Sequence, residues 1–137
     1  MYLLDTNVLS EMRKPGKADA RVRRWAEGVD AASLFVSVIS IFEMEKGVLS
    51  MERRDPRQGS ALRTWLTKHV LSAFNGRILP VDSAVAMRCA ALHVPDPRSD
   101  RDSFIAATAI VHNLTVVTRN VTDFKSTGVA VLNPWEF

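Results

Sequence analysis

Four acidic residues that lie far apart in the sequence could form one reactive site. They are Asp5, Glu43, Asp102 and Asp123. Converging carboxylates repel one another strongly at short distance unless a cation neutralises them. Ligation by oxygen alone suits a hard divalent ion such as Mg²⁺ or Mn²⁺. Such an ion can acidify a water molecule and stabilise charge on a phosphoryl oxygen, so phosphodiester cleavage is the chemistry that this set of residues indicates.

Each of these acids also has a purely structural alternative. Asp5 can cap a helix, and Asp102 suits the positive end of a helix macrodipole. Glu43 can be one of two exposed helical glutamates, since Glu45 is close by, and Asp123 can form a turn. The hypothesis of a common site therefore depends on whether the fold brings all four together.

Short β-type runs alternate with helical patterns along the chain, which predicts an α/β fold with a mostly parallel central sheet. We expect strands at 2–4, 34–38, 78–81, 114–118 and 129–132. We expect helices from 5–7 to a break at Pro15-Gly16, then at 18–27, 39–51, 60–74, 83–93 and 102–113, with loops at 55–59 and 95–100. In open parallel sheets the functional crevice lies outside the carboxyl ends of the strands. Asp5 directly follows the first strand, so that edge is where we expect the acids to meet.

Length and composition set the limits of this interpretation. The 137 residues suit one domain over 1–137, with no internal repeat or linker. A chain that is 47% hydrophobic and 24% charged excludes the disordered and fibrous classes. The single Cys89 excludes an internal disulfide framework and, with no signal peptide or membrane span, predicts a cytoplasmic protein with no membrane partner. The net charge of +3 is compatible with an anionic partner.

Five segments carry a family resemblance, in order and spread over essentially the whole chain. They are Leu3-Leu4-Asp5-Thr6-Asn7-Val8-Leu9-Ser10-Glu11, the segments 36–47 and 102–109, Val117-Thr118-Arg119-Asn120-Val121-Thr122-Asp123-Phe124, and the closing segment 128–135. With these segments the chain resembles the PIN-domain ribonucleases, specifically the toxins of bacterial VapBC-type toxin–antitoxin pairs and the related FitB proteins. The resemblance implies a PIN-like three-layer α/β/α sandwich.

The resemblance also implies roles for individual residues. Asp5, Glu43, Asp102 and Asp123 match the family's catalytic acids, and Asp5 and Asp102 are the leading ligands for Mg²⁺ or Mn²⁺. The supporting residues, which would orient carboxylates or water, are Thr6, Asn7, Thr118 and Asn120. Asp100 is a further candidate for the site, and Glu45 is the alternative to Glu43.

The function implied by the resemblance is a metal-dependent endoribonuclease that hydrolyses RNA phosphodiester bonds. It would act as the toxin of a type II toxin–antitoxin pair and be inhibited by a cognate antitoxin protein. We expect a homodimer, and contact with promoter DNA only indirectly, through the antitoxin. Arg98 and Arg101 lie next to Asp102 in the sequence, so we expect them to contact the RNA substrate.

Two other classes of function compete with this one. A haloacid-dehalogenase-like phosphatase also begins with a strand followed by Asp and uses Mg²⁺, but it requires a second acid where this chain has Asn7, and a catalytic lysine for which no candidate is evident. The other class is a non-catalytic PIN-like binding module that acts through an antitoxin–DNA complex. The presence of all four acids argues against such a loss of activity.

Overall fold

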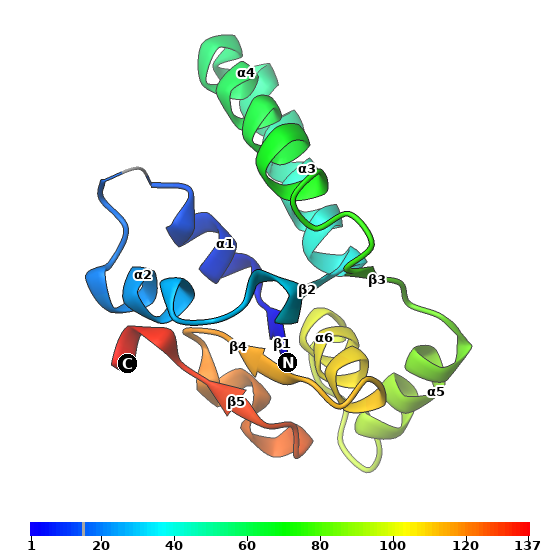
Figure 1. Ribbon diagram of the computed structural model, residues 1–137. Coiled ribbons are helices and arrows are strands. Elements are labelled where there is room, and N and C mark those ends of the chain that lie inside the picture. The colour runs from blue at the N-terminus through cyan, green and yellow to red at the C-terminus, as the bar shows by residue number, and fades with distance from the viewer. Residues whose placement is uncertain (15) are drawn as a thin grey trace.

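The computed structural model describes residues 1–14 and 16–137. Its centre is a five-stranded sheet with the strand order β3-β2-β1-β4-β5 (Figure 1). The strands are β1 (Tyr2–Leu4), β2 (Leu34–Ser37), β3 (Ile78–Leu79), β4 (Thr115–Val117) and β5 (Val131–Leu132). All four strand pairings are parallel, which confirms the expected α/β class. The carboxyl ends of the strands therefore share one edge of the sheet.

The central strand β1 places the first acidic residue at that edge. Leu3 and Leu4 are both fully buried and pack into different hydrophobic clusters, because successive side chains of a strand point to opposite faces. This double burial explains why the strand is apolar throughout. The main-chain N–H of Asp5 donates to the carbonyl of Val117 at 2.9 Å. Asp5 is thus held by the sheet at the point where β1 ends.

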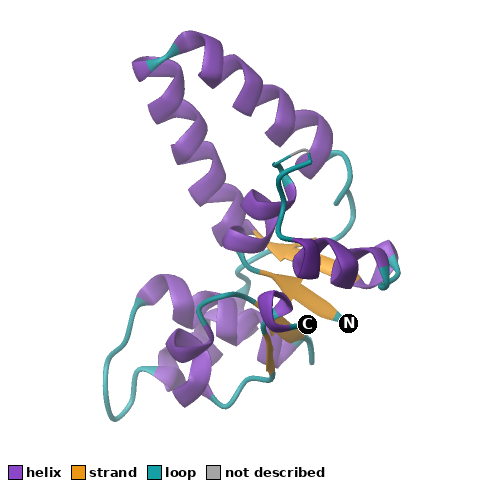
Figure 2. Ribbon diagram, turned by 90° about the vertical axis from the view of Figure 1, so that its left-hand side faces the viewer, coloured by secondary structure: helices purple, strands orange, loops and turns teal. Residues whose placement is uncertain are grey.

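Helices cover both faces of the sheet (Figures 1 and 2). The α-helices are α1 (Thr6–Met12), α2 (Ala20–Glu27), α3 (Val38–Arg54), α4 (Pro56–Thr64), α5 (Ser83–Leu92) and α6 (Asp100–Val111). Shorter helical elements are η1 (Ala31–Ser33), the π-helix η2 (Trp65–Leu71), η3 (Val121–Thr127) and η4 (Pro134–Glu136). Helices α1, α2 and α3 pack with Leu4 on one face, and α6 packs with Leu3 on the other. The predicted three-layer α/β/α sandwich is therefore confirmed.

The predicted loop at 55–59 is wrong, because α4 begins at Pro56 directly after α3 ends. Asp55 caps the C-terminus of α3 and the N-terminus of α4. Its main-chain N–H donates to the carbonyl of Met51, while its carboxylate accepts from the N–H of Gln58. Proline suits the first turn of a helix, where its missing N–H has no partner to lose. A Pro-Gly-bearing segment that suggested a loop thus starts a helix.

The remaining boundaries differ by a few residues from the sequence predictions. The helix expected from Asp102 begins at Asp100, because the Ser99 side chain caps it. The strand expected at 34–38 ends at Ser37, whose hydroxyl caps α3. Part of the predicted helix break, Pro15, lies outside the described residues. Within the described part of the chain, no helix combines the length and apolar character needed to cross a bilayer.

Candidate functional site

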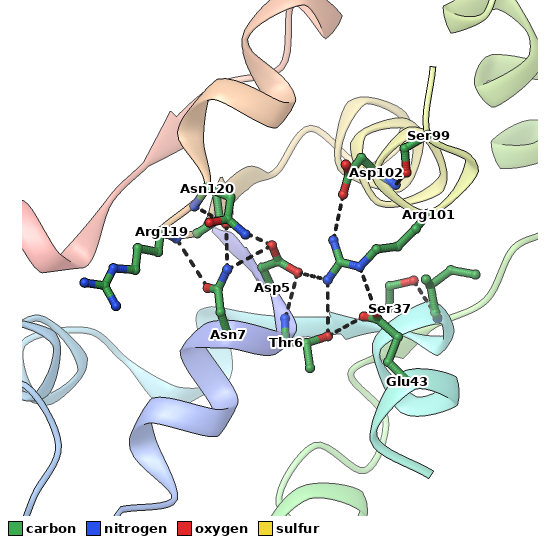
Figure 3. Close-up of polar contacts among 12 residues, drawn as sticks. Asp5, Thr6, Asn7, Ser37, Glu43, Ser99, Arg101, Asp102, Arg119 and Asn120 are labelled. Carbon is green, nitrogen blue, oxygen red and sulfur yellow. Dashed lines mark hydrogen bonds and ion pairs between the residues drawn. The ribbon is translucent and has the colours of Figure 1, made fainter. Parts of the chain in front are cut away.

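Three of the four predicted acids meet at the carboxyl edge of the sheet. Asp5 ends β1, Glu43 lies in the second turn of α3 after β2, and Asp102 lies in the first turn of α6. Their side chains point toward one another around the side chain of Arg101 (Figure 3). Asp5 is fully buried, whereas Glu43 and Asp102 are partly exposed. The topology therefore brings together carboxylates that are up to 97 positions apart in the sequence.

The guanidinium of Arg101 forms an ion pair with each of these three carboxylates. Its Nη2 lies 2.5 Å from Oδ1 of Asp5, and its Nε lies 2.6 Å from Oε2 of Glu43. Its Nη1 lies 2.7 Å from Oδ1 of Asp102. The planar guanidinium has donors fixed in a fork and can serve several acceptors at once. Arg101 is thus the positive group at the centre of the acidic cluster.

Polar neighbours fix the orientation of the buried Asp5 carboxylate. Oδ1 of Asp5 accepts from the main-chain N–H of Thr6 at 2.8 Å, and Oδ2 accepts from the Thr118 hydroxyl at 2.8 Å. The amide of Asn7 lies 3.4 Å from the same Oδ2 and donates to the Thr118 hydroxyl oxygen at 3.2 Å. That oxygen also accepts from the main-chain N–H of Asn120 at 3.0 Å. All four predicted supporting residues therefore lie beside the cluster.

Glu43 is held by two donors, which affects its ionisation. Burial raises the pKa of Glu43, but hydrogen bonds from Arg101 and from the Thr6 hydroxyl outweigh burial and bring the pKa below its ordinary value. The Thr6 hydroxyl donates to Oε1 at 2.7 Å. Burial lowers the pKa of Arg101, yet its bonds to Glu43, Asp5 and Asp102 raise it overall. At neutral pH, Glu43 is therefore a carboxylate and Arg101 a cation.

A cavity of about 550 Å³ opens beside this cluster. The walls include Thr6, Asn7, Arg101 and Asp102 from the cluster. The fourth predicted acid, Asp123, lines the same cavity from η3 and is exposed. Asp102 and Asp123 therefore line the cavity directly. The buried Asp5 and the partly exposed Glu43 do not line it, but both contact the wall residues Arg101 and Thr6.

Three further residues that the sequence suggested for the site make their contacts outside the acidic cluster. Arg98 donates to the carbonyl of Leu92 at 2.7 Å and to the Ser126 hydroxyl at 2.6 Å, so it ties its own loop to η3. Asp100 is exposed and lies 3.5 Å from the imidazole of His93. Glu45, the alternative to Glu43, forms an ion pair with Arg63 of α4 at 2.6 Å. The geometry thus favours Glu43 over Glu45 as the member of the cluster.

Two basic residues of the cavity wall were not among the residues that we predicted to contact substrate. Lys14 follows α1, and Arg119 follows β4 and lies over the ring of Trp135, 5.2 Å from its centroid. Arg119 stands next to the predicted residues Thr118 and Asn120, which is the signal that could have found it. Arg101 was expected to contact substrate, and its role as the partner of three acids was missed. The adjacent Asp-Arg-Asp order at 100–102 shows only that charges are close in the chain.

The chemistry of the donors fits a hard divalent cation, although the side chains are arranged around Arg101. Carboxylates from three elements offer oxygen ligands at one place, as Mg²⁺ and Mn²⁺ prefer. Within residues 1–14 and 16–137, however, no three His, Cys, Asp or Glu side chains stand close enough to hold a metal ion together. The guanidinium lies where their oxygens point.

The PIN domain family profile matches residues 2–129. Toxin FitB of Neisseria gonorrhoeae is 36% identical to this chain, with 98% of this chain and 99% of that protein aligned. The VapC ribonuclease Y4jK of Sinorhizobium fredii is 33% identical, with 99% of each chain aligned. The chain is therefore similar over nearly its whole length to one protein named a toxin and another named a ribonuclease.

Solved structures match the fold as well. The structure of FitAB bound to the IR36 DNA fragment contains a chain with a TM-score of 0.90 and 34% identity, covering 100% of this chain and 97% of that one. A chain of a toxin–antitoxin complex from Klebsiella pneumoniae has a TM-score of 0.69 and 26% identity, with 98% of each chain covered. Both neighbours are assemblies of more than one component.

Proposed function

Because this chain belongs to the PIN domain family, we propose that it is a metal-dependent endoribonuclease that acts as the toxin of a type II toxin–antitoxin pair. The observation that carries the proposal is the meeting of Asp5, Glu43 and Asp102 at the carboxyl edge of the sheet, beside a cavity that Asp123 also lines. Its similarity to a protein named a VapC ribonuclease favours RNA as the substrate.

The proposed roles follow from the position of each side chain. Asp5 and Asp102 would hold Mg²⁺ or Mn²⁺, with Glu43 and Asp123 completing or supporting the site. When bound, such a cation supplies a Lewis acid that makes a water more acidic and stabilises charge on a phosphoryl oxygen. Thr118 and the main-chain N–H of Thr6 hold the Asp5 carboxylate in one orientation, and the Thr6 hydroxyl does the same for Glu43.

The cavity wall offers groups that suit a polyanionic substrate. Lys14, Arg101 and Arg119 line it, and cations near an acidic centre attract a phosphate backbone. We propose Arg101 as a substrate contact on this basis. For Arg98 the proposal rests only on its position in the sequence, since its guanidinium is bonded to Leu92 and Ser126.

We propose a cognate antitoxin as the inhibiting partner and promoter DNA as an indirect one. The proposal rests on similarity to one chain of a complex described as toxin–antitoxin and to one chain of an assembly bound to DNA. A homodimer belongs to the same proposal through the family resemblance, and a cytoplasmic location is proposed from the single Cys89. Co-expression with the product of an adjacent short reading frame, followed by purification of a stable complex, tests the antitoxin.

The variant Asp5→Asn tests the enzymatic proposal. It removes the buried charge but keeps an oxygen that can accept from Thr6, so we expect the chain to fold. RNA cleavage in the presence of Mn²⁺ should fall by at least about 100-fold, because a metal ligand is removed. The matched control is Asp30→Asn, which changes an exposed acid at a helix cap that asparagine also forms well.

Cleavage should be measured on a fluorescent single-stranded RNA, and folding by circular dichroism. Retention of most of the activity by a folded Asp5→Asn protein, prepared free of host nucleases, contradicts the proposal. A loss of activity in Asp30→Asn as well would show that carboxylate removal acts nonspecifically. Chelation with EDTA should abolish wild-type cleavage, and added Mn²⁺ should restore it.

A further inference from the structure

The three site carboxylates use their oxygens almost completely within the protein. Arg101 takes Oδ1 of Asp5, Oε2 of Glu43 and Oδ1 of Asp102. Of the remaining oxygens, Oδ2 of Asp5 accepts from Thr118, and Oε1 of Glu43 accepts from Thr6. Of the six carboxylate oxygens of Asp5, Glu43 and Asp102, only Oδ2 of Asp102 accepts no hydrogen bond from the described part of the chain. Because the guanidinium lies between the three carboxylates and contacts each of them, a cation that joins two or more of them would have to lie where the guanidinium now lies.

The charges of the cluster also indicate that Arg101 and a divalent cation would compete for the same carboxylates. Three carboxylates and one guanidinium leave two uncompensated negative charges at a site where Asp5 is fully buried. The Asp5 carboxylate needs a cationic partner there, since an unpaired buried charge is strongly destabilising. Arg101 fills that role in the absence of a metal ion. A divalent cation brings twice the charge to the same oxygens.

The position of Arg101 in the fold would allow its guanidinium to be replaced by a cation. It extends from the first turn of α6, its side chain is 31% exposed, and it lines the open cavity. An arginine side chain is long and flexible, so the guanidinium can leave the carboxylates for the cavity without any displacement of the helix. By contrast, Thr6 donates to Asp5 through its main-chain N–H, and the short Thr118 side chain is held by the main-chain N–H of Asn120, so neither donor has the reach to leave Asp5 as an arginine can.

We propose that Arg101 is a built-in counter-ion of the metal site, and that its three ion pairs and a divalent cation exclude each other. This inference rests on the proposed metal-dependent function and adds a regulating residue to it. Arg101 stabilises the protein when metal is absent and lowers the affinity of the site for the cation. Metal binding releases its guanidinium into the cavity, where a phosphate of the substrate would be bound.

Isothermal titration of Mn²⁺ into the full-length protein and its Arg101→Gln variant tests the exchange. The variant should bind Mn²⁺ about tenfold more tightly or more, because binding no longer breaks charge-assisted hydrogen bonds. Without metal the variant should melt at a lower temperature than the wild type. Saturating Mn²⁺ should then raise its melting temperature by a larger increment than that of the wild type.

Arg119→Gln is the matched control, since it removes the same charge from the wall of the same cavity without touching an acid of the cluster. It should change Mn²⁺ affinity only slightly. Equal Mn²⁺ affinities in wild type and Arg101→Gln contradict the inference while leaving metal-dependent function intact. Failure of every variant to bind Mn²⁺ contradicts both. An equal gain in Mn²⁺ affinity in Arg101→Gln and Arg119→Gln would show that the loss of one positive charge near the site is sufficient. That result would also contradict the proposed exchange.

The wild-type protein provides a second readout that does not depend on the stability of a variant. The Nε–H of Arg101 donates to Glu43, and the Nε–H of Arg98 donates to the carbonyl of Leu92. In a ¹H–¹⁵N spectrum, titration with diamagnetic Mg²⁺ should shift or broaden the Arg101 Nε–H signal and leave that of Arg98 in place. An Arg101 signal that is unchanged at saturating Mg²⁺ would show that the ion pairs persist and would overturn the proposal.

Discussion

At the scale of single residues, Thr118 links the acidic cluster to the end of β4. Its buried hydroxyl donates to Asp5 and accepts from the Asn7 amide and from the main-chain N–H of Asn120. The Thr118 hydroxyl therefore makes three hydrogen bonds, one to a carboxylate and two from donors in different segments of the chain. A hydroxyl that is fully buried and fully paired in this way orients the carboxylate at little cost.

Thr118→Val should lower the free energy of unfolding by about 1–3 kcal/mol, because it leaves a buried carboxylate oxygen and two donors without their partner. Urea denaturation measures the change. Thr118→Ser retains the hydroxyl and is the matched control, which should remain within about 1 kcal/mol of the wild type, the loss expected for one buried methyl group. Equal losses in both variants would show that packing of the methyl group, rather than the hydroxyl, matters.

At the scale of elements, the hairpin of α3 and α4 carries Glu43 at its base and extends away from the sheet (Figure 1). Near the tip, Gly59 of α4 packs directly on Glu52 of α3. A Cβ added at Gly59 would lie 2.4 Å from the Glu52 Cα and 2.6 Å from its main-chain nitrogen. Lower down, Arg63 bridges Glu45 and Glu52. The hairpin is thus closed by a close main-chain approach and by one set of ion pairs.

Gly59→Ala should therefore destabilise the protein by about 1–3 kcal/mol, since the clash is with main-chain atoms that cannot rotate away. Gly47→Ala in α3 is the control. Nothing lies within 4 Å of a Cβ at that position, so the gain in helix propensity should stabilise the protein by about 0.5–1 kcal/mol. Thermal unfolding of both variants should give shifts of opposite sign, and a stabilised Gly59→Ala would refute the close approach.

At the scale of the whole molecule, a basic chain contains an acidic centre, and only some of its basic residues lie near that centre. The chain carries 18 Lys and Arg against 15 Asp and Glu, and three of the acids are gathered around Arg101. Lys14 and Arg119 line the cavity, while Arg53 and Arg57 lie at the tip of the α3–α4 hairpin, away from the sheet (Figure 1). The position of the basic residues, more than their number, determines which of them can meet a substrate.

The double variant Lys14→Ala/Arg119→Ala should weaken the binding of single-stranded RNA, measured by fluorescence anisotropy in the cleavage-deficient Asp5→Asn background. The slope of log K against log salt should become less steep by about 0.7 for each RNA phosphate that the variant no longer neutralises. The control Arg53→Ala/Arg57→Ala removes the same charge from the hairpin tip and should leave the slope nearly unchanged. Equal effects of the two pairs would indicate binding through net charge alone.

Much of the fold was predictable because its signals are local. A doubly buried parallel strand must be apolar throughout, so the run before Asp5 indicated β1. Helix periodicity gave α2 and α6 to within a few residues. The segment 55–59 was misassigned because proline and glycine favour loops in general, whereas here Pro56 starts a helix and Gly59 permits a close helix contact. Such a contact depends on a partner that is distant from the local pattern.

The amino-acid sequence established which residue types are available and, through the order of its motifs, the family to which they belong. Asp5 and Asp102 could be named because each lies at a recognisable strand or helix end, whereas Glu43, in the second turn of α3, was named through the family resemblance. The folded chain alone revealed that the guanidinium of Arg101 lies among them, that Arg98 points to Ser126, and that Lys14 and Arg119 share one cavity. This is because side-chain contacts across separate elements depend on strand order and helix packing, which no local spacing encodes.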